Sequence, residues 1–145
     1  MSHADHTIYH DLPIKAPVEK VYAAVTDPTH LMNWWPEYCT GNPVMGETYN
    51  FRFGPEYDWY AEVTEAQAPH HFHVKMTKSD PDWDPTSFGF DLEATDQGTQ
   101  LKFSHRGWPE CNAHFRHSSY CWAILLKALK DYVEKGKVIP FAERE

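Results

Sequence analysis

The sequence predicts an α+β fold in which a curved antiparallel sheet surrounds one long C-terminal helix. Up to residue 107, most segments alternate apolar and polar side chains, which is typical of strands with one buried and one solvated face. From about 110 to 135, the apolar side chains instead recur at helical spacing. Because no linker, repeat or low-complexity segment divides the chain, we expect residues 1–145 to form a single domain.

A strand and two helices are predicted near the N-terminus. Residues 6–14 alternate and form the first predicted strand. Residues 16–28 carry apolar side chains at helical spacing, and Pro17 suits the first position of a helix. A second short helix is predicted over 29–36, with Thr29 as its cap.

Five further strands are predicted, which gives six in all. They cover residues 47–53, 58–66, 71–78, 86–95 and 99–107. The short, turn-rich connections between most of them are typical of antiparallel hairpins. The segment 78–87 is long and acidic for such a turn, and it carries Trp83, which we expect to be exposed. We interpret this segment as a stiff surface loop or, alternatively, as a lid or a partner contact.

The C-terminal helix is expected to cover the dry face of the sheet. Its apolar stripe includes Trp122 and Leu129, and Gly136 follows it in the position where helices commonly end. At about 1.5 Å per residue, a helix over 110–135 is roughly 39 Å long. Because a straight helix cannot follow a curved sheet everywhere, we expect an apolar gap between the two.

We expect this gap to hold a small apolar molecule. The side chains predicted to line it are Phe51, Phe53, Trp59, Phe72, Phe88, Phe90, Phe103, His105, Phe115, Ser119 and Trp122. Apolar walls with a few polar groups are typical of such sites. Of the neighbouring Trp34 and Trp35, we expect one to be buried under the sheet and the other to lie near the mouth of the cavity.

Composition limits the partners of such a domain. Aromatic residues make up 15% of the chain, which favours a binding site as well as a core. A net charge of −8 would repel a phosphate backbone, so we expect no nucleic-acid partner. The chain has no signal-peptide-like start and no apolar run of about 18 residues, so we expect a soluble cytoplasmic protein without membrane insertion. Three scattered cysteines fit reduced thiols in that compartment.

His105, on the predicted dry face, allows three interpretations. It is a structural histidine with both ring nitrogens paired, a polar anchor for a ligand, or the general base of a cyclase-type or hydrolase-type enzyme. No partner carboxylate is evident at a useful spacing. We therefore assign no catalytic residue and no cofactor, and we expect binding rather than catalysis.

Two groups of potential metal ligands occur, and neither predicts a metal site. Cys111, His114 and His117 are three residues apart, but on a helix the first and third point about 120° apart, so the three cannot converge. The three histidines within 70–73 lie at a predicted turn into a strand, where we expect them to be exposed.

Four segments follow the pattern of a known family along nearly the whole chain. They are 14–36 with its paired tryptophans, 46–53, 96–110 with His-x-Gly, and 121–141 with a helix that ends in Glu-x-Gly-Lys. In these segments the chain resembles the START-like (SRPBCC) superfamily. Within that superfamily, it is similar to the C-terminal-type domain of the activator of the heat-shock protein 90 ATPase.

The resemblance implies a helix-grip fold, as in START and Bet v 1-like proteins, with a pocket between sheet and helix. Members bind lipids or other hydrophobic molecules, cyclise polyketides or stimulate the chaperone, so the fold alone leaves the function open. An interaction module, as a co-chaperone or a homodimer, is therefore a further alternative. Cys121 stands where members often have a small residue, and these 145 residues include no counterpart of the eukaryotic activators' N-terminal domain. We therefore do not expect chaperone activation.

Overall fold

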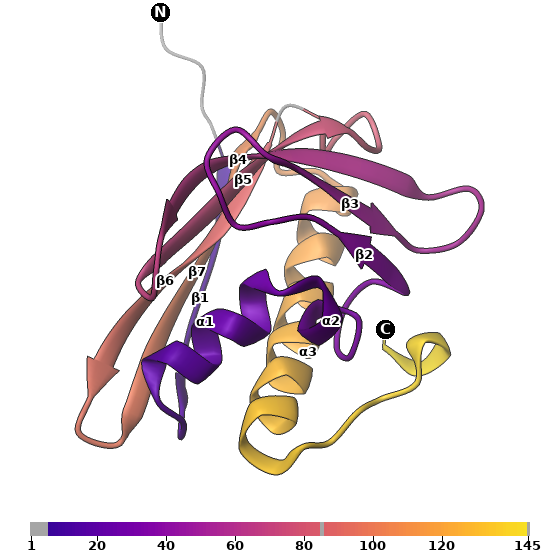
Figure 1. Ribbon diagram of the computed structural model, residues 1–145. Coiled ribbons are helices and arrows are strands. Elements are labelled where there is room, and N and C mark those ends of the chain that lie inside the picture. The colour runs from indigo at the N-terminus through magenta and orange to yellow at the C-terminus, as the bar shows by residue number, and fades with distance from the viewer. Residues whose placement is uncertain (1–5, 85, 145) are drawn as a thin grey trace, which may run out of the picture.

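One antiparallel sheet forms the frame of the computed structural model, which describes residues 6–84 and 86–144 (Figure 1). Its strands are β1 (His6–Ile14), β2 (Tyr38–Thr40), β3 (Thr48–Arg52), β4 (Asp58–Gln67), β5 (His71–Lys78), β6 (Ser87–Thr95) and β7 (Gly98–Trp108). They lie in the order β1-β7-β6-β5-β4-β3-β2, and every neighbouring pair is antiparallel. The sheet is thus a meander from β2 to β7, with the first strand added beside the last.

The strand that the sequence pattern did not reveal is β2. It has three residues, of which only Cys39 is buried, so it is too short for alternation to be evident. It pairs with β3, where Cys39 lies opposite Phe51. The predicted α+β architecture is confirmed, and the sheet has seven strands rather than six.

Three α-helices and a final turn complete the fold. They are α1 (Val18–Thr26), α2 (Pro28–Leu31), α3 (Ala113–Lys135) and the 3-10 turn η1 (Phe141–Glu143). The helix expected over 29–36 is only one turn long. Its cap is Asp27 rather than Thr29, because an Asp27 carboxylate oxygen accepts a hydrogen bond from the Thr29 backbone N–H at 2.9 Å.

Helix α3 begins and ends at recognisable capping residues. The Asn112 side chain accepts a hydrogen bond from the Phe115 backbone N–H at 2.9 Å, so the helix starts at Ala113 rather than at 110. Gly136 follows its last turn with φ of 67°, a left-handed conformation that glycine adopts without strain. These caps fix the length of the rod that crosses the sheet.

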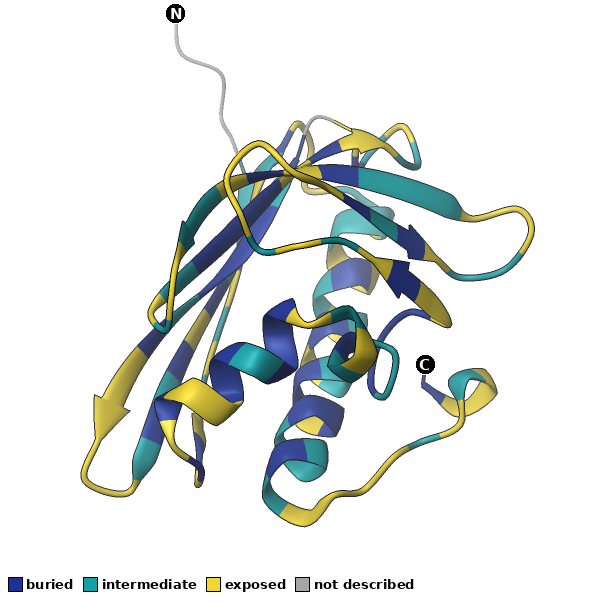
Figure 2. Cartoon of the chain, in the orientation of Figure 1, coloured by how far each residue is buried: buried dark blue, intermediate teal, exposed yellow. Residues whose placement is uncertain are grey.

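All three helices lie on the same face of the sheet (Figure 1). Helix α3 contacts β1 and α1, and α1 contacts β6 and β7. Buried residues occur on both the strands and the helices, as the dark blue segments in Figure 2 show, and they include residues of α1 and α3 as well as of the central strands. The fold therefore has one layer of helices on one layer of sheet, with the core between them.

The middle of this core is filled by the protein's own rings. We call these residues the aromatic centre: Phe51, Phe88, Phe103, His105, Trp108 and Trp122, each at most 1% exposed. The Trp122 ring lies 4.4 Å from Phe103 and 5.5 Å from Phe88, measured between ring centroids. The gap expected between sheet and helix is therefore closed at this centre, and an open space lies beside the first half of α3.

Candidate ligand-binding site

A cavity of about 600 Å³ lies beside α3, along the stretch from His114 to Leu125. Over this stretch the helix advances roughly 16 Å. The cavity is lined by Trp35, Phe53, Tyr57, Trp59, Asp80, Trp83, His114, His117, Ser118, Cys121, Trp122, Leu125, Phe141, Ala142 and Arg144. Its walls thus come from the segment after α2, the end of β3, the start of β4, the β5–β6 loop, α3 and the C-terminal turn.

Three of the eleven residues predicted to line a pocket do line this cavity: Phe53, Trp59 and Trp122. Six others lie in the packed core instead and do not reach it: Phe51, Phe72, Phe88, Phe90, Phe103 and His105. Alternation identifies the dry face of a strand, but it does not distinguish positions covered by a neighbouring ring from positions facing a void.

The remaining two predicted lining residues, Phe115 and Ser119, face another part of the molecule. The Phe115 ring packs edge-on against Trp108, with centroids 5.4 Å apart. Ser119 lies beside His10 of β1, whose Nε2 is 3.1 Å from the Ser119 carbonyl oxygen. Both therefore fasten α3 to the sheet outside the cavity.

Trp83, which the sequence suggested to be exposed, is only 7% exposed. Its indole N–H donates to the Ser118 hydroxyl at 3.4 Å, and its ring lies 4.9 Å from Trp59 and 4.5 Å from His105. The loop is also fixed by His114, whose Nδ1 lies 2.9 Å from an Asp82 carboxylate oxygen. The β5–β6 loop therefore folds inward and forms a wall of the cavity.

The other residues that line the cavity differ in how far the sequence could predict their position. Trp34 and Trp35 are both buried, at 0% and 6% exposed, and of the two only Trp35 lines the cavity. Trp83 carried a usable signal, because a large apolar ring between prolines in an acidic loop requires a place to be buried. Phe141 and Arg144 lie in a short tail without periodicity, and no pattern pointed to them.

His105 is buried in the aromatic centre with both ring nitrogens paired. Trp122 can only donate, so its indole N–H donates to His105 Nδ1 at 3.1 Å. The proton of the neutral ring is then on Nε2, which donates to the Thr86 hydroxyl at 2.8 Å. That hydroxyl in turn donates to the Trp83 carbonyl oxygen at 2.6 Å. This chain of hydrogen bonds ties the last strand to the helix and to the inward-folded loop.

The environment of His105 also holds it neutral. Burial, and secondarily the charge of His114, lowers the pKa of His105 from 6.5 to about 3. In this arrangement neither ring nitrogen is left for a substrate. The geometry is that of the structural histidine, the first of the three interpretations, rather than of a general base.

Arg144 is the most deeply buried cation of the cavity wall, at 7% exposed. Its Nε–H donates to the Ile139 carbonyl oxygen at 2.8 Å, and its NH1 group donates to the carbonyl oxygens of Trp35 and Pro36, both at 3.2 Å. Burial lowers the pKa of the guanidinium from its ordinary value. Arg144 therefore fixes the C-terminal turn across the end of the cavity.

The Cys-His-His group at the start of α3 does not converge on a metal position. Cys111 is exposed, His114 is paired with Asp82, and the Nε2 of His117 lies 3.4 Å from the Cys121 sulfur. Each of the two histidines thus has its own neighbour, and Cys111 precedes α3, so the helical spacing on which the sequence argument relied does not extend to it.

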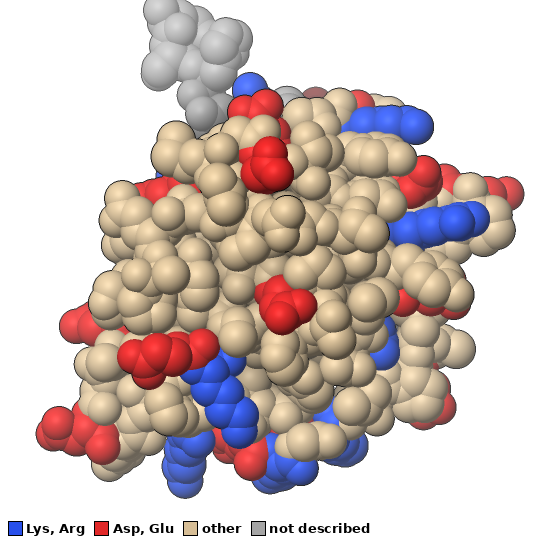
Figure 3. Space-filling model, viewed as in Figure 1, with Lys and Arg blue, Asp and Glu red and all other residues tan. Residues whose placement is uncertain are grey.

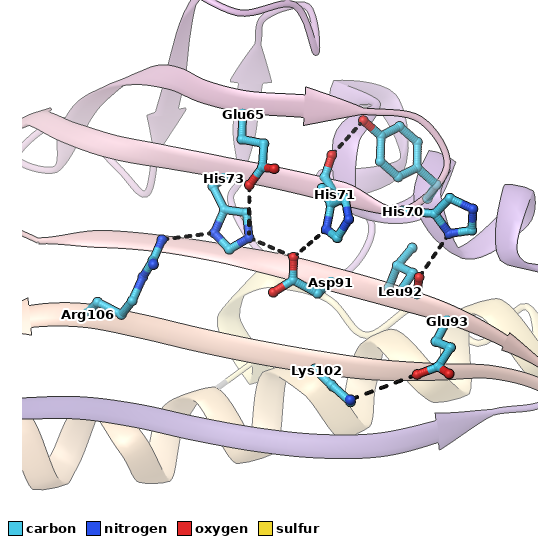
Figure 4. A network of polar contacts seen from close by, with 10 residues as sticks. Glu65, His70, His71, His73, Asp91, Leu92, Glu93, Lys102 and Arg106 are labelled. Atoms are coloured by element: carbon cyan, nitrogen blue, oxygen red, sulfur yellow. Dashed lines mark hydrogen bonds and ion pairs between the residues drawn. The ribbon is translucent and has the colours of Figure 1, made fainter.

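A separate polar network lies on the outer face of the sheet (Figure 4). His73 was expected to be exposed, but it is 5% exposed. Its ring lies over Gly89, where an added Cβ would come within 2.1 Å of His73 Nδ1 and therefore could not be accommodated. Its Nε2 is 2.9 Å from an Asp91 oxygen, and the hydrogen bonds from His73 and His71 lower the pKa of Asp91, although burial alone would raise it.

This network does not fit a metal ion, although its ligand atoms are close together. In the described residues, 6–84 and 86–144, Glu65, His73 and Asp91 form the one group of three such side chains, with ligand atoms within 4.8 Å of one another. Arg106 donates to His73 Nδ1 at 3.3 Å, which leaves the ring proton on Nε2. A metal on Nε2 would move this proton to Nδ1, where it would face Arg106, a group that cannot accept it.

Comparison with known proteins supports the fold described above. The family model described as Activator of Hsp90 ATPase homolog 1-like protein matches residues 15–134. The chain belongs to this family. The predicted resemblance to the START-like superfamily and to the Hsp90 activator is thereby confirmed. No functionally curated protein matches the sequence significantly.

Solved structures extend this result. The structure described as the solution structure of the Aha1 dimer from Colwellia psychrerythraea is 32% identical, with a TM-score of 0.83 over 91% of this chain and 98% of that chain. Protein SSP2350 from Staphylococcus saprophyticus is 17% identical, with a TM-score of 0.79 over 92% of this chain and 96% of that chain. CalU16 from Micromonospora echinospora is 16% identical, with a TM-score of 0.69 over 91% of this chain and 77% of that chain. The last two share the fold.

Surface charge and the hydropathy of the helices are two further features of the molecule. On the face shown in Figure 3, the basic side chains lie mainly at the lower and right-hand edges and the centre is largely uncharged. None of the helices in the part of the chain that the structure describes is long and apolar enough to cross a bilayer.

Proposed function

We propose that this family member binds a small, predominantly apolar molecule in the cavity beside α3. The observation that carries the proposal is the composition of the wall, where four tryptophans and two phenylalanines surround about 600 Å³. This volume is within the range of about 300–1,000 Å³ of typical small-molecule sites. Aromatic walls favour ligands with flat apolar surfaces, because rings stack on one another.

The rings of the wall are held in place by contacts with other aromatic rings. Trp35 packs against Phe51 and Trp122, each with centroids 4.9 Å apart. Phe53 and Trp59, by contrast, are only partly buried and stand at the cavity, 5.1 Å from each other. A ligand would cover them further and gain about 25 cal/mol per Å² of apolar surface removed from water. Little rearrangement would be needed, which keeps the cost of binding low.

The proposed role is binding without catalysis. What supports this is the pairing of His105, which binds Trp122 and Thr86 through its two nitrogens. An enzyme of cyclase or hydrolase type that used His105 as its base would have to break one of these bonds.

Titration with the neutral fluorophore N-phenyl-1-naphthylamine tests the proposal. We expect saturable binding to the wild type, with stronger and blue-shifted fluorescence. Leu125→Trp should abolish it, because the larger ring would fill the cavity from α3. Ala123→Trp is the matched control, since Ala123 is exposed on the same helix and does not line the cavity. Absence of binding to the wild type, or equal binding by the two variants, would contradict the proposal.

A second candidate function is self-association. What supports it is the relative at 32% identity that is described as a dimer. Exposed apolar side chains also gather near the edge strand β2, where Tyr38 is 59% and Met45 is 67% exposed. Light scattering on the purified protein tests this function, since a dimer should have twice the mass of the 16.9 kDa chain. A monomer at micromolar concentration would exclude it.

The proposal places the protein in the cytoplasm and assigns it no nucleic-acid partner. Its net charge of −8 supports the second statement, because a phosphate backbone would be repelled. Filter binding to single-stranded and double-stranded oligonucleotides at low salt would reveal any affinity that contradicts it.

A further inference from the structure

The charge of Arg144 has no counter-charge within the part of the chain that the structure describes. The hydrogen bonds of this side chain go to backbone carbonyl oxygens of Trp35, Pro36 and Ile139, and none of the ion pairs among residues 6–84 and 86–144 includes it. Carbonyl oxygens satisfy N–H donors, but they do not neutralise a cation. A buried cation without a partner charge is costly, so its position in a cavity wall requires an explanation.

The second terminal nitrogen of the guanidinium is available to a ligand. The Nε–H and NH1 groups are used by the three carbonyl oxygens, whereas NH2 donates to none of the described residues. Among the described residues, the indole nitrogen of Trp108 is the one polar side-chain atom that is fully buried and has no hydrogen bond. Because NH2 also has no hydrogen bond but is not fully buried, it keeps some exposed surface. Arg144 lines the cavity, so these two unused N–H groups belong to a side chain of the cavity wall.

The other polar groups of the wall do not compensate for this charge. His114 is paired with Asp82 at 2.9 Å, and His117 lies 3.4 Å from the Cys121 sulfur. Asp80, the acidic residue of the wall, belongs to the β5–β6 loop. That loop packs near the start of α3, away from the C-terminal turn that carries Arg144 (Figure 1). Within the wall, the acidic residue and the buried cation are therefore carried by separate elements.

We infer that the molecule held in this cavity carries an anionic group, a carboxylate or sulfonate, that lies against Arg144 while its apolar body lies among the tryptophan rings. This inference rests on the proposed function and specifies the class of ligand as apolar acids. The anion supplies a counter-charge that none of the described residues provides, and it accepts from NH2. Charge-assisted hydrogen bonds of this kind are roughly twice as strong as neutral ones. Asp80 repels the same group, so the ligand has one preferred orientation.

Two fluorophores that share a ring system separate this inference from the proposed function. N-phenyl-1-naphthylamine is neutral, and 8-anilinonaphthalene-1-sulfonate carries a sulfonate on the same rings. The quantity to measure is the ratio of their dissociation constants, neutral over anionic. We expect Arg144→Gln to lower this ratio roughly tenfold, as the loss of a charged hydrogen bond predicts, and Arg144→Lys to preserve most of it.

Arg52→Gln is the matched control, because it removes the same charge from an exposed residue that does not line the cavity. If Arg144 only anchors the C-terminal turn, Arg144→Gln will weaken both fluorophores equally and leave the ratio unchanged, which would overturn the inference. Binding of the neutral fluorophore to the wild type would still support the proposed function in that case. Failure of both fluorophores to bind would overturn the proposed function itself.

A measurement on the wild type alone removes any dependence on how the variants fold. 1-Naphthoic acid labelled with ¹³C in its carboxyl group is titrated with acid while bound, and its NMR shift reports its pKa. Beside Arg144 the bound acid should have a pKa below that of the free acid. A raised pKa would show an apolar surrounding without a cation and would contradict the inference.

Discussion

The aromatic centre and the cavity are built from the same kinds of side chain, but their rings are covered differently. Phe88 and Phe103 in the centre are each 1% exposed, whereas Phe53 and Trp59 at the cavity are only partly buried. In the centre, rings from the sheet and from Trp122 of α3 fill the space between the two layers. At the cavity, the opposing elements are the β5–β6 loop and the C-terminal turn, which leave a gap.

This difference shows how a small domain can have both a stable core and a pocket. The centre carries the packing that holds the sheet to the helix, and the cavity uses the same rings with one side uncovered. Trp122 belongs to both regions, since it is 1% exposed and still lines the cavity. Substitutions should therefore cost stability in the centre and affinity at the cavity.

The largest effect is expected for Trp122→Ala. Removing this buried ring leaves a void and takes away the hydrogen bond to His105, so we expect a loss of about 3–5 kcal/mol in the free energy of unfolding, measured with urea. Trp59→Ala, at the partly buried rim, should cost about 1–2 kcal/mol. Equal losses in the two variants would remove the distinction between centre and cavity.

The pH dependence of stability sharpens the comparison through His105. The unfolded chain binds a proton at His105 below its ordinary pKa of 6.5, whereas the folded state binds it only near pH 3. Stability contributed by this residue is thus present above pH 6.5 and is lost as the pH falls from 6.5 towards 3, by at most about 1.4 kcal/mol per pH unit.

His105→Gln is the variant that tests this dependence. Glutamine can still donate to Thr86 and accept from Trp122, but it does not titrate. Urea unfolding at pH 7 and pH 5 should show that the wild type loses more stability than the variant, by about 1–2 kcal/mol. Identical losses would mean that His105 is not kept neutral by burial.

The smallest effect compares two fully buried tryptophans. The indole N–H of Trp34 donates to the Ala24 carbonyl oxygen at 2.9 Å, whereas that of Trp108 has no acceptor among the described residues. Substitution by Phe removes the same atoms at both positions but breaks a hydrogen bond only at Trp34. We expect Trp34→Phe to cost about 1 kcal/mol more than Trp108→Phe in thermal or urea unfolding. A larger loss of unfolding free energy for Trp108→Phe than for Trp34→Phe would mean that the Trp108 indole N–H has a hydrogen-bond acceptor, and it would contradict this comparison.

Most of the fold could be predicted because its signals are local. Alternation located six strands, and the helical stripe before Gly136 located α3. The three-residue β2 is not predicted because so short a segment shows no period. The helix expected over 29–36 is too long, since α2 ends at Leu31. These errors concern the ends and the edges of the elements, where side-chain patterns are weakest.

The site was less predictable because it depends on contacts between distant segments. Phe53, Trp59 and Trp122 were expected at the cavity, and all three are there. Phe90 and Phe103 have the same alternation but lie under other rings. Trp83 and Arg144 reach the wall through a folded loop and a tail, whose paths no periodicity describes. Hydrophobic pattern reveals which residues are buried, but not what covers them.

The indole N–H signals of the six tryptophans give the most direct test of the claim that the cavity beside α3 is the binding site. Each tryptophan contributes one resolvable signal in a ¹⁵N–¹H spectrum, assigned with single Trp→Phe variants. On titration with N-phenyl-1-naphthylamine, the signals of the four cavity tryptophans, Trp35, Trp59, Trp83 and Trp122, should shift, while those of Trp34 and Trp108 should stay in place. Shifts confined to Trp34 and Trp108, or no shifts at saturating fluorophore, would contradict the account.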